Sequence, residues 1–545
     1  MLVEIKSRER HSDLRLHRRW CRLGRCCGCG PTFRRTAGTG SCFLEAGPAK
    51  HPGPRIPIGY AKLLTNPKAN WLYSSEPEAS TNGRRLSVPR GRILGGSSAI
   101  NGLAFVRGQA RDYDTWAQLG NRGWSYQDVL PHFKRMETYH AGGDEQYRGR
   151  SGPLQINNPE PRDEIFRTII KAAGEAGIAH NPDYNGAVQD GIAMSQASIH
   201  AGRRMSTAHC YLEPARNRAN LRIETDALTE RVLLDGKRCR GVRYSVNGQP
   251  REAHAAREVI ISAGSINSPQ LLELSGVGQP ERLRPLGIEV NHALPGVGEN
   301  LRDHYAPRTR WAIGKRGVTL NDRGRGLGLV NQALRYAFTG KGMLGMVAAP
   351  LRAFVRSREG LEGPDVLLGW VPMLTVLGPK GPKISPQSGV TCYAHTMRPE
   401  SRGHIHITAA DARKPPAINF NFLSSPIDAE ITIRAIRIAR SIMYAPAMAE
   451  LKVSEIGPGQ ALQSDDEILG WVKEVGETTY HPVGTCKMGN DRMAVVDERL
   501  RVRGIAGLRV ADASIMPTIT SGNTNAPSIM IGEKAAAMVL EDRTS

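Results

Sequence analysis

The sequence predicts an α/β (α+β) fold, and two regions of the chain carry this prediction. One region contains four runs of apolar and β-branched residues of strand length, at 221–223, 232–234, 241–244 and 259–262. Asp235-Gly236 between two of these runs is a typical hairpin turn. The last run continues into Ser262-Ala-Gly-Ser-Ile-Asn-Ser-Pro-Gln-Leu-Leu272, which predicts a strand end, a glycine turn and a helix start. In the other region, residues 310–465, short apolar runs alternate with Gly and Pro, which suits a mixed sheet with helices.

Length and composition indicate a globular protein with a substantial core. The chain has 545 residues, of which 40% are hydrophobic, so it has room for two domains or one large composite domain. Lys and Arg outnumber Asp and Glu by 73 to 52, which gives a net charge of +21. This charge is scattered along the chain, and aromatic residues make up only 6%, so nucleic-acid bases would find few stacking platforms. We therefore expect no nucleic-acid partner.

The same survey gives expectations about location, disulfides and metals. No apolar run approaches the ~18–20 residues that cross a bilayer, and the N-terminus lacks the apolar segment of a signal peptide. We expect a cytoplasmic protein, with peripheral contact at the inner face of the membrane as an open alternative. Five of the nine cysteines crowd into residues 21–42 and the rest are isolated, which is not a disulfide framework. Cys26-Cys-Gly-Cys29 has no second Cys or His pair at zinc spacing, so no metal site is expected.

The N-terminal residues 1–43 differ from the rest of the chain. Arg, Cys, Gly and Trp are mixed there without helical or strand period, so neither element can be drawn. Regular sequence begins abruptly at Leu44-Glu-Ala-Gly-Pro48. Gly326-Leu-Gly328 does not resemble a nucleotide-binding turn, because no apolar strand precedes it and no third glycine follows.

A stretch rich in Gly and Ser follows, at residues 89–102. Its sequence is Pro89-Arg-Gly-Arg-Ile-Leu-Gly-Gly-Ser-Ser-Ala-Ile-Asn-Gly102, and such small residues let backbone N–H groups meet a phosphate or the edge of a ring. Taken alone, this stretch could equally be an ordinary loop. Further on, Ser125 with Asp128 three residues later predicts the start of a short helix.

The C-terminal part of the chain contains the candidate catalytic residues. His481 lies in a turn that Pro482 and Gly484 impose on the backbone. A polar loop rich in Gly and Asn, residues 520–534, runs into a helix, with Asn525 at the mouth of that helix. A histidine base and an amide on two loops suit the removal of a proton from an alcohol. A surface or structural role is the alternative for a lone histidine.

Three motifs in this part resemble the glucose–methanol–choline (GMC) oxidoreductase family. They are His481-Pro-Val-Gly-Thr-Cys-Lys-Met-Gly489, Ala511-Asp-Ala-Ser514 and Gly522-Asn-Thr-Asn-Ala-Pro527, in this order. The stretches at 89–102 and 262–272 resemble the two signatures of the same family, and the resemblance covers about residues 44–540.

The resemblance implies a discontinuous, Rossmann-like FAD-binding domain and a mixed-sheet substrate domain over the flavin. The expected FAD-binding segments are 44–155, 215–310 and 466–545, and the substrate-binding and lid segments are 156–214 and 311–465. Residues 1–43 form an aberrant N-terminus in which the first βα unit of the family, with its Gly-x-Gly-x-x-Gly turn, is missing.

The family's functional residues are carried over by motif. The implied catalytic pair is His481 and Asn525. The implied FAD-binding residues are Glu45, Arg92, Gly95, Gly96, Ser97, Asn101, Gly102, Val232, Ala263, Gly264, Asp512, Ala513, Thr524 and Ala526. Ile100 stands where some members have a histidine bonded to the flavin, so the resemblance implies non-covalent FAD. For His304, structural and functional roles are equally open.

The implied function is that of a choline-dehydrogenase-like, FAD-dependent alcohol dehydrogenase. It would oxidise a primary alcohol to an aldehyde by hydride transfer to flavin N5 and pass the electrons to a quinone or another acceptor. One alternative is an oxidase that uses oxygen, and another is an inactive apoprotein, because the glycine-rich FAD loop is missing. The implied partners are a small alcohol and the electron acceptor, and no oligomeric state is predicted.

A shift of reading frame would account for the aberrant N-terminus. Permitted codons for residues 15–25, read one nucleotide later, give Asp-Tyr-Ile-Val-Val-Gly-Ala-Gly-Ser-Ala-Gly, a strand followed by the missing turn. Residues 31–43, read two nucleotides later, give Asn-Leu-Ser-Ala-Asp-Arg-Gly-Asn-Arg-Val-Val-Leu-Leu, which leads into Leu44. A frameshift in the gene or in its sequencing is one hypothesis, and a divergent, unrelated N-terminus is the alternative.

Overall fold

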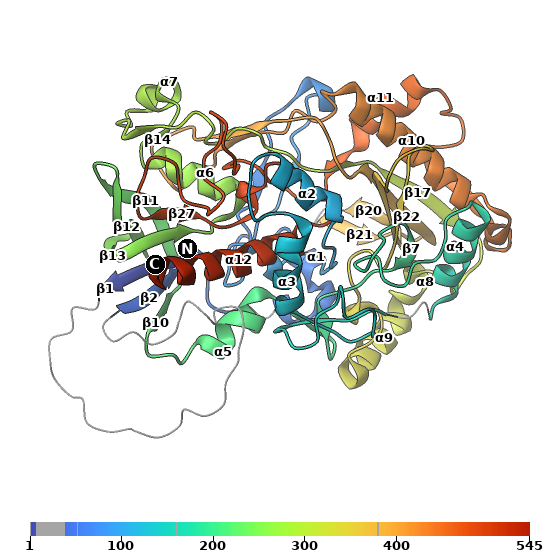
Figure 1. Ribbon diagram of the computed structural model, residues 1–545. Coiled ribbons are helices and arrows are strands. Elements are labelled where there is room, and N and C mark those ends of the chain that lie inside the picture. Colours follow the sequence, from blue (N-terminus) through green and yellow to red (C-terminus); the bar gives the residue numbers. More distant parts are fainter. Residues whose placement is uncertain (1, 7–38, 52, 160–161, 379–380, 545) are drawn as a thin grey trace.

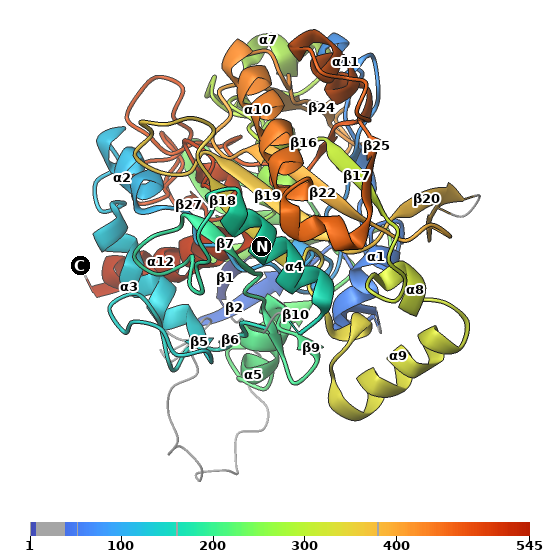
Figure 2. The same cartoon turned by 90° about the vertical axis from the view of Figure 1, so that its right-hand side faces the viewer.

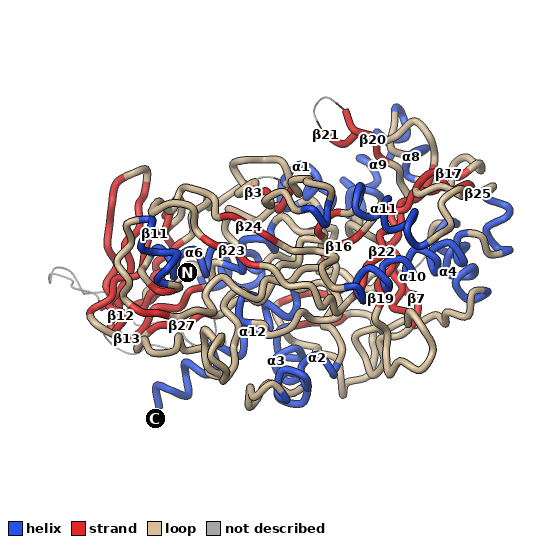
Figure 3. Tube along the Cα trace, turned by 90° about the horizontal axis from the view of Figure 1, so that it is seen from above, coloured by secondary structure: helices blue, strands red, loops and turns tan. Residues whose placement is uncertain are grey.

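The computed structural model of the protein describes residues 2–6, 39–51, 53–159, 162–378 and 381–544. It has the mixed helices and sheets of the predicted α/β class. Figure 1 shows one β-sheet toward each end of the molecule, and the long helix α12 (Asn525–Thr544) extends from the first sheet toward the middle. Figure 3 shows that the region between the two sheets is rich in loops.

The first sheet has the strand order β10-β2-β1-β13-β12-β11, with β27 paired to β13. Its strands are β1 (Leu2–Lys6), β2 (Thr39–Leu44), β10 (Leu221–Glu224), β11 (Ala227–Asp235), β12 (Arg238–Val246), β13 (Gln249–Ile261) and β27 (Leu508–Val510). The four strands predicted between residues 221 and 262 lie within β10 to β13 or end one residue beyond them, and Gly236 turns from β11 into β12 at φ 53°. Helix α6 (Gly264–Leu274) begins at the predicted glycine turn.

The expectation that residues 1–43 hold no strand is wrong. Strand β1 lies between β2 and β13, and Thr39–Leu44 form β2, so the first sheet has no gap at this place. However, β1 runs antiparallel to both neighbours: Leu2 pairs with Phe43 and Ile260, near the ends of β2 and β13. The chain therefore leaves β1 at the end of the sheet opposite to the one where β2 and β13 finish. The shifted reading of residues 15–25 and most of that of 31–43 lie outside the described residues.

The second sheet is antiparallel, with the order β25-β17-β22-β19-β18-β7. Its strands are β7 (Gly191–Met194), β17 (Arg308–Ile313), β18 (Leu351–Val355), β19 (Val366–Val371), β22 (Gly389–Thr396) and β25 (Val453–Gly457). Helices α4 (Glu164–Glu175) and α10 (Pro426–Met443) pack against it, as Figure 2 shows. Trp311 and Trp370 are fully buried in the core between this sheet and these helices.

Smaller elements connect and flank the sheets. The remaining helices are α1 (Tyr60–Leu63), α2 (Ala110–Gln118), α3 (Tyr126–Met136), α5 (Glu213–Ala215), α7 (Pro280–Leu283), α8 (Leu320–Arg323), α9 (Gly326–Thr339) and α11 (Asp465–Val475). The remaining strands are β3 (Tyr73–Ser74), β4 (Ser87–Val88), β5 (Glu137–Tyr139), β6 (Leu154–Ile156), β8 (Ile199–His200), β9 (Arg203–Arg204), β14 (Val277–Gly278), β15 (His292–Ala293), β16 (Tyr305–Ala306), β20 (Thr375–Gly378), β21 (Gly381–Ile384), β23 (His404–His406), β24 (Ala417–Asn419) and β26 (Glu477–Thr478). Ser125 caps α3 as predicted, in a capping box with Asp128. Across the described parts of the chain, no helix has both the length and the apolar character needed to cross a membrane.

Candidate active site

A cavity of about 940 Å³ occupies the loop-rich region between the two sheets. Three strands of the first sheet end at its wall: Glu45 follows β2, Ala263 follows β13 and Asp512 follows β27. Ligands of open α/β sheets bind at the carboxyl ends of parallel strands, and this cavity lies at such an edge. Loops from the second half of the chain, including the one that carries His481, close its other side.

The backbone of the His481 loop is held in an unusual conformation. Tyr480 has a φ of 68°, which is rare for a residue with a side chain and costs conformational energy. Gly484 has a φ of 92°, and a Cβ atom there would lie 2.4 Å from the carbonyl oxygen of Asn300. The backbone N–H of His481 donates to Asp303 Oδ1 at 2.9 Å. The loop is therefore fixed on both sides of the histidine.

A chain of hydrogen bonds on one side of His481 determines which ring nitrogen carries its proton. His304 Nε2 lies 2.8 Å from the carbonyl oxygen of Met397, which can only accept, so Nε2 of His304 carries a hydrogen. Nδ1 of a neutral His304 is then an acceptor, and His481 Nδ1 donates to it at 3.1 Å. Thr479 Oγ1 also lies 2.8 Å from His481 Nδ1 and can accept from it. The lone pair of neutral His481 is therefore on Nε2.

The hydrogen bonds on the other side of the His481 ring also leave Nε2 unprotonated. Arg352 Nη1 donates to Asn523 Oδ1 at 2.8 Å, which orients the amide of Asn523 with its NH2 group the other way. Asn523 Nδ2 then donates to His481 Nε2 at 2.9 Å. Both neighbours of His481 thus require an unprotonated Nε2, at the wall of the cavity.

The surroundings of His481 also keep the whole ring neutral. Burial lowers the pKa of His481 well below its usual value, and interaction with His395 and with the positive charges of Arg90 and Arg352 lowers it further. His304 stacks on His395 at a ring distance of 4.5 Å, and burial lowers the pKa of His304 as well. At neutral pH the cavity therefore presents a histidine that is free to accept a proton.

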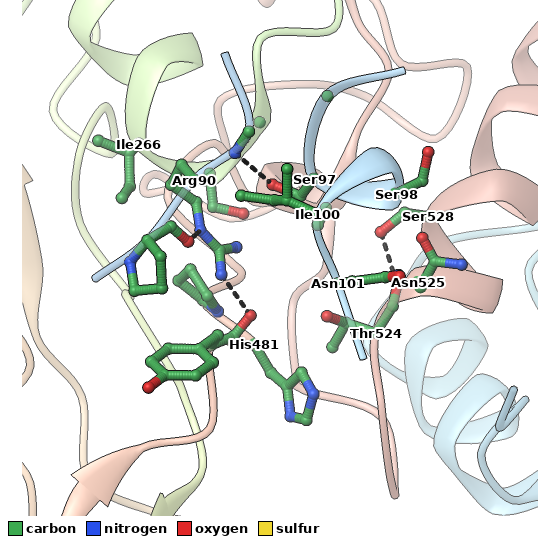
Figure 4. Close-up of a pocket in the computed structure, with 18 of the residues that line it drawn as sticks. Arg90, Ser97, Ser98, Ile100, Asn101, Ile266, His481, Thr524, Asn525 and Ser528 are labelled. Atoms are coloured by element: carbon green, nitrogen blue, oxygen red, sulfur yellow. Dashed lines mark hydrogen bonds between the residues drawn. The ribbon is translucent and has the colours of Figure 1, made fainter. Parts of the chain in front are cut away.

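The structure pairs His481 with Asn523 and not with Asn525, the residue expected from the sequence. Asn525 is the first residue of α12 and lines the same cavity on the far side from His481, as Figure 4 shows. The two asparagines are separated by one residue, so the motif alone does not distinguish them. The start of the helix distinguishes them, because Asn525 belongs to it whereas Asn523 is in the preceding loop.

The stretch at 89–102 forms the part of the wall that faces these residues (Figure 4). Gly95 and Gly96 have φ values of 89° and 52°, which favour glycine. A Cβ atom on Gly91 would lie 2.2 Å from the backbone of Gly96, so the two turns need glycine to approach each other. Ile100 also lines the wall and is buried.

Most of the residues expected from the sequence meet in this one cavity. Besides His481 and Asn525, its wall contains Glu45, Gly95, Gly96, Ser97, Asn101, Gly102, Ala263, Gly264, Asp512, Ala513 and Thr524. Three expected residues do not line it. Arg92 lies over the ring of Trp71 at 5.1 Å, and Val232 and Ala526 are buried in the hydrophobic core. On β11 it is Ala227, Leu228 and Thr229 that reach the cavity.

Several prominent residues of the wall carried no signal in the sequence. They are Asn523, Tyr60, Tyr393, Tyr480, Arg90, Arg308 and Arg352. All except Asn523 and Tyr480 lie outside the motifs around His481 and at 520–534, on segments that only the fold brings together. A buried arginine in strand β18 resembles any other polar residue of a strand until its neighbours are known.

The residues present fit FAD at its two ends. Glu45 directly follows β2; its Oε1 accepts from Gly47 N at 2.8 Å, and burial raises its pKa to about 7. A carboxylate after the second strand suits the ribose hydroxyls of a dinucleotide. At the other end, the amino end of α12 and the glycine turns offer N–H groups and a positive dipole to the flavin.

The described residues do not provide the usual seat for the pyrophosphate. In such sheets the pyrophosphate binds at the turn after the first strand, at the end of the sheet that faces the cavity, whereas β1 finishes at the opposite end of the sheet. The arginines of the cavity wall are Arg90, Arg308 and Arg352, and all three lie at the His481 end: Arg90 donates to the carbonyl oxygen of Tyr480 at 2.6 Å, and Arg308 pairs with Glu477 at 2.5 Å.

Comparison with known proteins identifies the family. The family models described as GMC oxidoreductase match residues 35–306 and 399–532. The oxygen-dependent choline dehydrogenase of Brucella anthropi is 42% identical over 478 residues, which cover 86% of this chain and 85% of that protein. The mitochondrial choline dehydrogenase of Mus musculus is 39% identical over 497 residues, covering 90% and 82%.

Solved structures agree with this result. An FAD-dependent oxidoreductase from Chaetomium thermophilum superimposes with a TM-score of 0.84 at 25% identity, covering 92% of this chain and 95% of that one. A formate oxidase superimposes with a TM-score of 0.85 at 26% identity, covering 92% and 94%. The chain therefore belongs to the GMC oxidoreductase family of FAD-binding flavoproteins.

Proposed function

We propose that the protein oxidises a primary alcohol to an aldehyde. The bound FAD supplies the acceptor for the hydride of the carbinol carbon. His481 Nε2 takes the hydroxyl proton, so the alcohol loses a hydride and a proton and becomes the aldehyde. The observation that carries this proposal is the unprotonated Nε2 of His481 at the cavity wall, a state that the hydrogen bonds from Met397 to Arg352 fix.

Asn523 and Arg352 assist this proton transfer in different ways. Asn523 Nδ2, beside His481 Nε2, is placed to donate to the alcohol oxygen while negative charge develops on it. Arg352 acts through Asn523, because its hydrogen bond fixes the amide in the donating orientation. We therefore assign the amide role to Asn523, and give Asn525 a place at the flavin through the amino end of α12.

The test is the replacement of the base, made in the protein whose residues 15–43 are restored by a shift of reading frame so that flavin is bound. His481→Ala should slow the reduction of the flavin by alcohol at least ~10²-fold, the usual scale for a lost general base. Flavin content should stay the same, and His254→Ala, a highly exposed histidine outside the cavity, should behave like the wild type. Reduction of the flavin by His481→Ala at the wild-type rate would show that the role is wrong.

The charges around the cavity suggest which alcohols it accepts. A quaternary ammonium group such as that of choline needs a free carboxylate or an aromatic cage. The carboxylates of the described wall are all engaged: Glu45 with Gly47, Glu477 with Arg308, Asp512 with Gly264, and Glu533 with Arg135. Arg352 is fully buried, and its Nη2 has no hydrogen-bond partner among the described residues. The wall also offers aromatic rings to an ammonium group, at Tyr60, Tyr393 and Tyr480, so only its charges disfavour choline. On this ground we propose that the enzyme prefers an alcohol with a neutral or anionic oxygen group over choline.

Three alcohols of similar size test this preference. They are choline, its uncharged analogue 3,3-dimethylbutan-1-ol, and 3-hydroxypropanoate, and the measurement is kcat/KM for each. The expected order has the uncharged and anionic alcohols above choline. A higher kcat/KM for choline would contradict the charge preference only, whereas no flavin reduction by any alcohol would contradict alcohol oxidation itself.

For the electron acceptor we propose a quinone or another carrier. The oxidase alternative has specific support, because the Brucella anthropi relative is described as oxygen-dependent. Peroxide formed in air, compared with dye reduced under nitrogen, decides between them. Stoichiometric peroxide at a rate equal to that of dye reduction would favour the oxidase.

A further inference from the structure

Helix α9 (Gly326–Thr339) turns an apolar side toward solvent. Four residues spaced three or four apart form one stripe, the apolar stripe: Leu327 (88% exposed), Val330 (54%), Leu334 (53%) and Phe338 (85%). The other side of the helix packs on the protein, where Gln332 is buried and Tyr336 Oη donates to the carbonyl oxygen of Gly202 at 2.9 Å. A surface helix normally buries its apolar side, so this reversed arrangement marks an interaction surface.

Three segments of the chain at and near α9 contain no acidic residue, although acidic residues such as Asp322 and Glu359 adjoin their ends. The segments 46–75, 191–212 and 323–358 together hold 13 Lys and Arg residues and not one Asp or Glu. With 52 acidic residues among 545, these 88 residues would hold about eight at the average of the chain. The lack of acidic residues is therefore local, and the three segments contribute 13 of the 21 net positive charges of the chain.

The three segments form one continuous surface. Tyr336 of the third bonds to Gly202 of the second, and a Cβ atom on Gly202 would lie 2.5 Å from Gly340. The guanidinium group of Arg204 in the second donates to carbonyl oxygens of the first, at Pro54 (3.0 Å) and Pro57 (3.1 Å). Figures 1 and 2 both show α9 at the periphery of the molecule.

Positive side chains without a carboxylate partner among the described residues lie in the segments around the apolar stripe, and one of them, Arg325, donates to the carbonyl oxygens of Ile384 and Pro386. Seven of them are exposed: Arg55, Lys62, Lys68, Arg203, Arg325, Arg335 and Lys341. None of the seven forms an ion pair with a carboxylate of the described residues. Arg335 belongs to α9 itself, and Arg325 and Lys341 flank its two ends.

We propose that this surface binds an anionic lipid bilayer, with the apolar stripe of α9 buried between the headgroups and the surrounding cations on the lipid phosphates. An apolar helix face beside exposed Lys and Arg is the arrangement that interfacial helices use. Each cation near an anionic bilayer adds to the attraction. A second copy of the chain is a poorer partner, because a symmetric contact would bring like charges together.

The surface adjoins the wall of the cavity. Tyr60, Ala61 and Leu64 of the first segment and Ala348 of the third line the cavity. The cavity wall would then lie beside the membrane, where an apolar acceptor such as a quinone dissolves. This last consequence rests on the proposed function, whereas lipid binding does not.

Sedimentation of the full-length protein with vesicles tests the proposal, after aggregated protein has been removed by centrifugation without vesicles. We expect binding to vesicles of equal parts phosphatidylcholine and phosphatidylglycerol, weaker binding at high salt, and little binding to phosphatidylcholine alone. The double variant Leu327→Ser/Phe338→Ser keeps every charge and should lose at least ~10-fold in partition coefficient. The double variant Arg325→Gln/Arg335→Gln should lose a similar factor.

The matched control is Leu119→Ser/Val188→Ser, which changes two exposed apolar residues outside the three segments and should bind like the wild type. Thermal melting of each variant shows that it is folded, and vesicle binding needs no turnover, so the outcome is independent of the alcohol chemistry. A wild type that stays in the supernatant, or binding that the α9 variants leave unchanged, would overturn the proposal. Self-association that Leu327→Ser/Phe338→Ser abolishes, without vesicle binding, would assign the surface to a second copy instead.

Discussion

The position of one proton decides whether the histidine of this site can act as a base. Met397 accepts from His304 on one side, and Arg352 orients Asn523 on the other, so two independent chains of bonds leave the same nitrogen of His481 free. Met397, Arg352 and Asn523 were not expected from the sequence to take part, and His304 was left open between two roles. Single residues therefore acquire their chemical meaning here from partners up to 177 positions away.

The two asparagines of the 522–527 motif should have separable effects. Asn523→Ala should slow flavin reduction by alcohol ~10²-fold with little change in flavin content, because it removes the donor beside His481 Nε2. Asn525→Ala should instead change flavin content or absorbance, because Asn525 opens the helix α12. Stopped-flow reduction and flavin-to-protein ratio measure both effects. A larger loss of rate in Asn525→Ala would return the catalytic role to that residue.

Arg352 should set the pH range of the reaction. Its positive charge helps to lower the pKa of His481, and His481 loses its function as a base when pH falls through that pKa. Arg352→Met should raise this pKa, so the acid limb of kcat/KM moves to higher pH by roughly one pH unit. Arg352→Lys keeps the charge and should leave the limb in place, even if the rate falls. An unmoved limb in Arg352→Met would exclude this electrostatic role.

Ile100 should leave the flavin unattached. It lines the cavity and is buried, and its side chain has no nucleophile that could bond to a flavin. Acid precipitation of the yellow protein should therefore release all the flavin into the supernatant. Colour that stays with the pellet would indicate attachment through another residue.

Among the elements, the loop from Thr479 to Gly484 determines the position of the base. Its backbone depends on glycine at 484, as the turn predicted from Pro482 and Gly484 indicated, whereas the strain at Tyr480 carried no signal in the sequence. By contrast, the sequence did not indicate the direction of strand β1. Residues 2–6 pair with both neighbours, but in the antiparallel sense, and nothing in their composition indicates that direction.

Gly484→Ala should test how strictly this loop is held. The new Cβ would meet the carbonyl oxygen of Asn300 at 2.4 Å in a φ region unfavourable to alanine, so we expect a loss of at least roughly 2 kcal/mol in the free energy of unfolding. The displaced His481 should also slow flavin reduction. Gly470→Ala in α11 is the control, since a Cβ there meets nothing within 4 Å and should stabilise by roughly 0.5–1 kcal/mol. Equal stabilities would show that the loop adapts.

For the whole molecule, the sequence predicted the class of fold and the motifs at the cavity, but not the side chains that face one another there. The strands at 221–262 followed from their apolar runs, because local pattern and burial agree. Arg352, Tyr60 and Tyr393 were not predicted, because their position depends on how the two sheets are packed. We propose the division into FAD-binding segments (44–155, 215–310, 466–545) and substrate-binding segments (156–214, 311–465) on this two-sheet arrangement.

The N-terminal region decides whether the assembled cavity can hold its cofactor. The pyrophosphate of FAD needs N–H groups at the amino end of a helix that follows the first strand, and β1 ends at the wrong edge of the sheet for this. We expect the chain as given to be mostly apoprotein, poorly soluble and weakly active. Shifting the reading frame across residues 15–43 would supply Asp-Tyr-Ile-Val-Val-Gly-Ala-Gly-Ser-Ala-Gly before Glu45. This strand would run parallel to its neighbours and end at the cavity.

The two proteins should be expressed side by side and compared in flavin-to-protein ratio and in alcohol-dependent dye reduction. The shifted protein should be yellow and active, because its parallel first strand, in place of β1 between β2 and β13, brings the glycine turn to the cavity wall between Glu45 and Ala263. A third protein, with the shifted frame and Ala in place of the second glycine of the turn, is the control, and it should lose flavin again because the backbone can no longer approach the phosphates. Equal flavin loading and activity in the original and shifted proteins would refute the frameshift hypothesis and show that residues 1–43 complete the site as they stand.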